Sequence, residues 1–163
     1  MPYKDPKQLF LKLLSDVRKH EEGLTDTLNT LREKADDKET KDYLDSLSYL
    51  SEKNLDTIDR CFKMIGEQPL PVEDKLRDLF LEDFRREFNE IESPLVKFLY
   101  FKSKVNFLMN VRGGEWATLI AMSDISGNRG VGVLLESCLA QKIAFVERSR
   151  RHIRHVIEEK MSK

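Results

Sequence analysis

Residues 6–35, PKQLFLKLLSDVRKHEEGLTDTLNTLREKA, carry the apolar pattern that decides the fold class. Apolar side chains recur every three or four residues, and Pro6 stands where a helix tolerates a first-turn proline. The stripe consists of Phe10, Leu13, Leu14, Val17, Leu24, Leu28, Leu31 and Ala35. Glu21 falls between Val17 and Leu24 on the same face. The stretch therefore predicts a long helix that carries a carboxylate within its buried face.

Turn residues divide the rest of the chain into four further helical stretches. Asp37 is placed to cap the second helix, which should end at Gly66. Ser93 and Pro94 have the pattern of an N-cap followed by a first-turn proline. The predicted ranges are 37–66, 73–92, 94–125 and 129–161, and the glycines at 113–114 suggest a kink, a π-bulge or a close helix approach in the fourth helix.

These stretches predict an all-α protein. Four long helices joined by short polar turns or one crossover indicate an up-down four-helix bundle, with the shorter helix at 73–92 lying in the middle connection. A chain of 163 residues is large enough to bury a core without disulfides or metals, so we expect a single domain over 1–163.

Composition argues against several classes of partner. The 28 basic and 29 acidic residues nearly cancel, so no overall field attracts nucleic acid or an anionic membrane. Cys61 and Cys138 lie far apart without zinc-site spacing, and we interpret them as reduced, buried thiols of a cytoplasmic protein. No run of about 18 apolar residues is present, so we expect neither a membrane span nor secretion.

Two further charged residues fall within apolar stripes. Arg112 occupies the position between Met109 and Trp116, and Lys142 lies on the inward side of the last helix. A buried charge is costly unless it is paired or bound to a metal. One carboxylate against two cations argues against a metal, so Glu21, Arg112 and Lys142 are either a functional centre or the remains of one.

Several local runs point to a known family. They are Leu13-Leu14-Ser15-Asp16 followed by Glu21, Ile58-Asp59 with Ile65-Gly66-Glu67-Gln68-Pro69, Ala117-Thr118-Leu119-Ile120-Ala121 with Gly127, and Leu134-Leu135-Glu136. With these runs the chain resembles the YciE/YciF family of ferritin-like bacterial proteins over most of its length, except about 70–95. The resemblance implies a ferritin-like bundle and, in the family, a metal pair held by carboxylates and histidines from four helices.

This sequence departs from that ligand pattern at most positions. Glu21 stands where the family has its first carboxylate. The Glu-x-x-His positions of the second helix hold Tyr49 and Glu52, and Glu52 falls toward the flank of the stripe. The fourth helix has Met109, Asn110 and Arg112, and the last helix has Ala140, Gln141 and Lys142, in place of the remaining ligands.

We therefore expect a charge network in place of the metal. In this hypothesis Arg112 and Lys142 stand where the cations stood and pair with Glu21 and also Glu52, with no cofactor. Breaking the pair with Arg112→Leu should then cost about 3–5 kcal/mol, which Glu21→Leu in the same chain should largely restore. The alternative is that the long Arg112 and Lys142 stems carry their charges out to solvent.

Two functions remain open from the sequence. The first is a non-catalytic, stress-related bundle that acts through protein or small-ligand contacts. The second is a di-metal carboxylate oxidoreductase or metal-storage protein with an atypical site of Glu21, Glu52, Glu115 and a histidine. The second needs an inward histidine, and we expect the histidines at 20, 152 and 155 to lie at the surface.

Partner predictions come from two regions. The basic run at 148–155 suits a solvated helix end, and an acidic partner or nucleic acid backbone is the alternative. Seven aromatic residues surround the shorter helix: Phe80, Phe84, Phe88, Phe98, Tyr100, Phe101 and Phe107. Most should be core, but Tyr100 and Phe101 give their helix more apolar surface than one bundle needs. We therefore expect a homodimer through this region.

Overall fold

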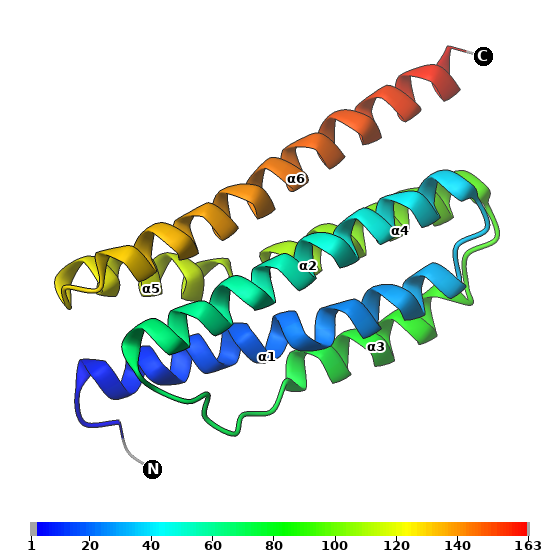
Figure 1. The fold of residues 1–163 in the computed structure, drawn as a ribbon. Helices are drawn as coiled ribbons and strands as arrows, with labels where there is room; N and C mark the ends of the chain where they lie inside the picture. The colour runs from blue at the N-terminus through cyan, green and yellow to red at the C-terminus, as the bar shows by residue number, and fades with distance from the viewer. Residues whose placement is uncertain (1–2, 163) are drawn as a thin grey trace.

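The computed structural model describes residues 3–162, and helices account for most of this range (Figure 1). The elements are α1 (Pro6–Glu33), α2 (Lys38–Ile65), α3 (Lys75–Phe88), α4 (Pro94–Asn110), α5 (Gly113–Ile125) and α6 (Arg129–Met161). Between residues 3 and 162 there is no strand, so the all-α prediction is confirmed. None of these helices combines the length and the apolar character needed to cross a bilayer.

The first two helices and the last begin and end close to the predicted residues, and in α1 and α2 the first turn is capped by a neighbouring aspartate. The Asp37 carboxylate accepts a hydrogen bond from the backbone N–H of Thr40 at 2.8 Å and so starts α2. Gly66 ends α2 in the left-handed region, at φ 70°, where a side chain would be strained. α1 and α2 pack along one another as a hairpin (Figure 1).

α3 lies in the connection between α2 and α4, and it packs against α1 and α4. Asp74 caps its first turn. The helix ends at Phe88, so the predicted end near Glu92 is wrong. Ser93 precedes Pro94 and takes an extended conformation, at φ −74° and ψ 128°, because proline disfavours a helical residue before it.

The single helix predicted over 94–125 is two helices. α4 ends at Asn110, and Arg112 leaves the helical region, at φ −113° and ψ 19°, before α5 begins at Gly113. Gly113 and Gly114 lower the helix propensity at this point. α5 then packs against α6 and also contacts α1, while α4 packs against α6 (Figure 1).

Buried apolar side chains form two separate clusters. The aromatic cluster contains Leu24, Leu28, Leu31, Ala35, Leu44, Leu47, Phe80, Phe84, Phe88, Phe101, Val105, Leu108, Met109 and Phe145. The cysteine cluster contains Phe10, Leu14, Val17, Ile58, Cys61, Phe62, Trp116, Leu119, Val131, Leu135 and Cys138. Both cysteines are buried and free, as predicted. Each cluster draws side chains from α1, α2 and α6, so these helices run through both.

The aromatic residues expected at a dimer face are mostly used inside the chain. Phe101 is buried and packs edge-on to Phe88, with ring centroids 5.3 Å apart. Tyr100 is half-buried, and its hydroxyl donates to Glu87 at 2.9 Å. These two residues therefore do not supply the spare apolar surface that the sequence suggested. Phe107 stays about half exposed and stacks on Phe80.

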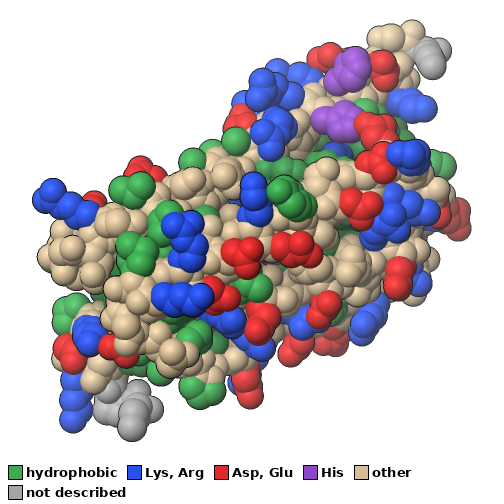
Figure 2. Space-filling model, in the orientation of Figure 1, with side chains coloured by type: hydrophobic (Ala, Val, Ile, Leu, Met, Phe, Trp, Pro, Cys, Tyr) green, Lys and Arg blue, Asp and Glu red, His purple; other side chains and the backbone are tan. Residues whose placement is uncertain are grey.

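Charges of both signs are interspersed over the face drawn in Figure 2, without a large patch of one sign. Surface pairs such as Arg32 with Asp45, 2.7 Å apart, account for part of this mixture. Exposed pairs of this kind each contribute about 1 kcal/mol or less to stability.

Candidate functional site

A layer of polar side chains separates the aromatic cluster from the cysteine cluster. In α1 the cysteine cluster ends at Val17 and the aromatic cluster begins at Leu24, and the buried residues between them include His20 and Glu21. The other long helices and the α4–α5 break repeat this order. The polar layer consists of His20, Glu21, Ser51, Asn54, Asp74, Arg112 and Lys142, each buried to at least nine-tenths.

One half of the layer is built around Glu21. Its carboxylate, 1% exposed, forms an ion pair with the Lys142 ammonium, 3% exposed, so α1 and α6 meet through two opposite charges. The Ser51 hydroxyl from α2 lies 3.0 Å from Glu21 Oε2 and 3.1 Å from the Glu21 backbone carbonyl, and it donates to one at a time. The Lys142 ammonium also lies 5.6 Å from the centre of the Trp116 ring. Three helices and a ring thus enclose this pair.

The other half is built around Asp74, the N-cap of α3. Its carboxylate lies 3.2 Å from His20 Nδ1 and 3.6 Å from an Arg112 nitrogen. Burial opposes ionisation of Asp74, but the His20 hydrogen bond and the Arg112 charge outweigh it and hold the pKa of the carboxyl below its usual value. Arg112 also donates to both oxygens of Glu115, at 2.7 and 2.9 Å.

His20 joins the Asp74 half to α4. Its Nε2 lies 3.2 Å from the backbone carbonyl of Leu108, which can only accept a hydrogen bond. Its other nitrogen faces the Asp74 carboxylate, which is also an acceptor when ionised. Both contacts are satisfied when the two ring nitrogens carry protons, so this geometry suits an imidazolium between Asp74 and Leu108.

The predicted network is therefore divided in two. Lys142 lies beside Glu21, whereas Arg112 pairs with Asp74 and Glu115, so the expected Arg112–Glu21 pair is wrong. The break between α4 and α5 explains this, because it turns Arg112 toward the start of α3. Glu52 is exposed, since its neighbour Ser51 takes the inward position on α2. Both cations are buried, so the alternative in which their charges reach solvent does not hold.

The histidines also differ from expectation. His20 is buried, 3% exposed, because α1 is covered by α2 on one side and by α3 and α5 on others, which widens its buried arc. His152 is half-buried and lies 2.7 Å from Glu39, while His155 is exposed as predicted. Asp74, Ser51 and His20 are the functional candidates that the sequence reasoning missed. For Asp74 the available signal was its position before the Lys75 helix, where a carboxylate caps.

The polar layer does not fit the metal pair that the ferritin-like resemblance implies. Lysine and arginine offer no lone pair to a metal at neutral pH, and Lys142 already neutralises Glu21. Glu115 is bound by Arg112, and Glu52 lies away at the surface. Over residues 3–162, no three His, Cys, Asp or Glu side chains are grouped closely enough to hold an ion.

The thiols of Cys61 and Cys138 lie in the apolar surroundings of the cysteine cluster. Burial, together with the neighbouring Cys138, raises the pKa of Cys61 to about 12. Burial also raises the pKa of Cys138. Thiols in such surroundings stay protonated and behave as small apolar side chains.

Comparison with known proteins supports the fold and the family. Several solved structures are similar in fold, including the following three, and no curated protein matches the sequence. The E. coli stress protein YciF superposes with a TM-score of 0.87 at 15% identity, over 96% of this chain and 99% of that one. YcfI from Rhodopseudomonas palustris superposes with a TM-score of 0.82 at 20% identity, over 90% of this chain and 94% of that one. A protein of Xanthomonas campestris pv. campestris gives 0.71 at 11% identity over 97% of both chains.

The sequence itself matches one family model almost from end to end. The model is the domain of unknown function DUF892, and it covers residues 5–162. The resemblance to the YciE/YciF family drawn from the sequence is thereby confirmed. The chain belongs to the DUF892 family and has the all-helical fold seen in YciF.

Proposed function

We propose that this protein is a non-catalytic, ferritin-like bundle in which side-chain charges stand in place of a di-metal centre, and that it acts through contacts with a protein or small ligand. The observation that carries the proposal is the Lys142 ammonium seated against Glu21 in the middle of the core. The four long segments of the bundle are α1, α2, α4 with α5, and α6. The description of the similar E. coli protein as a stress protein supports a stress-related role.

The charge balance of the polar layer supports this function. Lys142 compensates Glu21, and Arg112 lies between Asp74 and Glu115. A metal ion placed beside Glu21 would have to displace the ammonium and leave it buried without a partner, which is costly. A centre in which each carboxylate already faces a cation offers no open ligand position for redox chemistry.

Metal retention tests the proposal. Metal-free protein is incubated with Fe(II), Mn(II) or Zn(II), desalted and analysed for bound metal, with thermal melts run in parallel. We expect no stoichiometric retention and no rise in Tm. Glu21→Gln serves as the matched control, because it removes the carboxylate that stands at the family's first ligand position and pairs with Lys142. Stoichiometric metal that raises Tm and is lost in Glu21→Gln would overturn the proposal in favour of a metal-dependent oxidoreductase or storage protein.

A further inference from the structure

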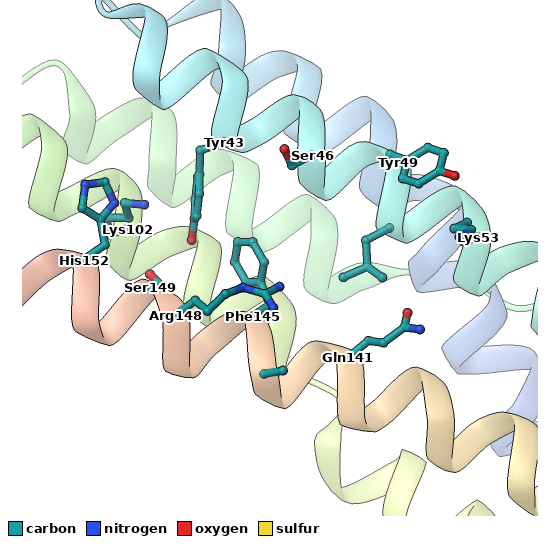
Figure 3. Close-up of a pocket in the computed structure, with 12 residues that line it drawn as sticks. Tyr43, Ser46, Tyr49, Lys53, Lys102, Gln141, Phe145, Arg148, Ser149 and His152 are labelled. Atoms are coloured by element: carbon teal, nitrogen blue, oxygen red, sulfur yellow. The ribbon is translucent and has the colours of Figure 1, made fainter.

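A second polar feature lies outside the polar layer, in a cavity of about 640 Å³ between α2 and α6. Figure 3 shows Tyr43 on α2 and Ser149 on α6 facing each other across it, with Lys102 reaching in from α4. No residue of the polar layer lines this cavity. Cavities of roughly 300–1,000 Å³ are the size that holds small-molecule ligands.

Lys102 is the buried charge of this cavity. The residue is 2% exposed, and its ammonium makes no hydrogen bond or ion pair within the described part of the chain. Its nearest partners are aromatic rings: the ammonium lies 3.2 Å from the centre of the Tyr43 ring and 5.5 Å from that of Phe98. Cation–π contact compensates only part of the cost of burying an ammonium, so an anion beside Lys102 would be stabilised there.

Two buried hydroxyls point to the same requirement. Tyr43 and Ser149 lie near each other, but neither hydroxyl completes a hydrogen bond of good geometry. Three buried polar groups without satisfied partners thus surround one cavity. Buried polar groups normally have hydrogen-bond partners, so three such groups around one cavity are suited to a ligand that accepts hydrogen bonds.

The rest of the lining favours a negative ligand with an apolar body. Lys53 and Arg148 add further basic groups, His152 is paired with Glu39, and no aspartate or glutamate of residues 3–162 lines the cavity. Burial lowers the pKa of Lys102 to about 8, so the ammonium form still predominates at neutral pH. Leu50 and Phe145 provide apolar wall between the polar groups.

We propose that this cavity binds a small organic anion, whose carboxylate or phosphate accepts hydrogen bonds from Lys102, Tyr43 and Ser149 and whose apolar body packs against Leu50 and Phe145. The inference rests on the proposed function in so far as it names the class of small ligand. It does not depend on the metal content of the core, because the two sites share no residue.

Binding to the full chain is measured by calorimetry and by amide NMR shifts, with benzoate and phenyl phosphate as probes. Inorganic phosphate tests whether an anionic group without an apolar body is enough for binding. Benzyl alcohol has a similar ring but no charge, so it tests whether the negative charge is needed. We expect the two aromatic anions to bind saturably, with shifts along α2 and α6, and benzyl alcohol and inorganic phosphate to bind more weakly by about tenfold.

Lys102→Met should weaken aromatic-anion binding by about tenfold or more, since it removes the buried charge. Lys104→Met is the matched control, because Lys104 lies on the same helix but pairs with Glu87. The Lys104→Met variant should bind the aromatic anions as the wild type does. Ala144→Phe fills the cavity from its exposed side and should also abolish binding. Equal binding by the wild type and Lys102→Met, or no saturable binding of either anion by the wild type, would overturn the inference while leaving the metal test of the core unaffected.

Discussion

Buried charges in this molecule differ in what surrounds them. Glu21 and Lys142 neutralise each other in the core, with Ser51 satisfying a second carboxylate oxygen. Lys102 is equally buried but faces aromatic rings and hydroxyls only. Removing one member of a pair leaves a buried charge behind, whereas removing an unpaired charge relieves a cost. Substitutions at the two lysines should therefore change stability in opposite directions.

Lys142→Met is expected to destabilise the protein by about 3–5 kcal/mol, because Glu21 would remain buried without its partner. The double variant Glu21→Gln/Lys142→Met should recover much of this loss. Urea denaturation gives the free energies of unfolding for a double-mutant cycle. Additive losses in the cycle would contradict a direct pair.

A double-mutant cycle at Arg112 should show coupling to Asp74, with which Arg112 pairs in the structure. The sequence alone predicts coupling to Glu21 instead.

Lys102→Met is expected to stabilise the protein by about 1–3 kcal/mol at pH 7. The folded-state pKa of Lys102 is lowered to about 8 from its usual 10.5, mainly by burial and against the attraction of Glu39 and Asp37. The cost of the buried charge is therefore fully present below pH 8 and vanishes as pH rises to about 10.5. The other titratable side chains that line the cavity are Tyr43, Tyr49, Lys53, Arg148 and His152, and His152 pairs with Glu39. Denaturation at several pH values should show the gain shrinking above pH 8, and a constant gain would show that the ammonium is not its cause.

Helical periodicity places Glu21, Arg112 and Lys142 on apolar stripes, and all three side chains are buried in the structure. Periodicity could not assign the partners. Asp74 reaches the layer from the loop before α3, and His20 is buried because α2, α3 and α5 all pack against α1. The sequence pattern predicts Glu52 in the network, but Ser51 holds the inward position on α2 and Glu52 is exposed. Successive residues of a helix point about 100° apart, so an error of one residue is enough to move a side chain from the core to the surface.

At the scale of the elements, the helix ends follow local chemistry and the α4–α5 break does not. Asp37 and Gly66 form caps from nearby residues alone, and the sequence predicted both. Arg112, at the break, has no side-chain cap and pairs with Asp74 from a different element, so the sequence offered only the glycine pair as a sign of low helix propensity. A sequence with a capped turn at this point would have shown the break directly.

Gly114→Ala should raise stability by about 0.5–1 kcal/mol, because a Cβ there meets no atom within 4 Å and alanine favours helix. Gly66→Ala should lower stability by about 1 kcal/mol, because its φ of 70° strains any side chain. The two changes add the same methyl group, so thermal or urea unfolding compares them directly. Loss of stability in Gly114→Ala would show that the first turn of α5 needs a flexible residue.

At the scale of the whole molecule, the aromatic cluster leaves a smaller apolar surface than the sequence suggested. Leu76 and Leu79 on α3 and Phe107 on α4 are 41%, 57% and 49% exposed. Phe107 stacks on Phe80, one helical turn from Leu76, so we propose that these residues form the contact of a homodimer.

Sedimentation velocity tests this contact. The wild type should sediment as a dimer, and Leu79→Glu should weaken the dimer by about tenfold or more, since it places a charge in an apolar interface. Val133→Glu is the control, because Val133 is also an exposed apolar residue, 65% against 57% for Leu79, but lies on α6. A wild-type monomer, or equal effects of the two substitutions, would contradict the proposed face.

The polar layer also fixes how far α6 is shifted along its axis relative to α1. Apolar side chains lie on both sides of this layer, and burial of apolar surface is not directional, so apolar burial specifies the axial position of α6 against α1 less sharply than a charge pair does. A slide of α6 by one helical turn, about 5.4 Å, would set Lys142 against leucines and leave Glu21 facing a hydrophobic neighbour. Single buried polar contacts fix alignment in this way between helices whose apolar faces are interchangeable. The ion pair thus selects one axial register for the bundle, and with it the position of the cavity that Lys102 enters.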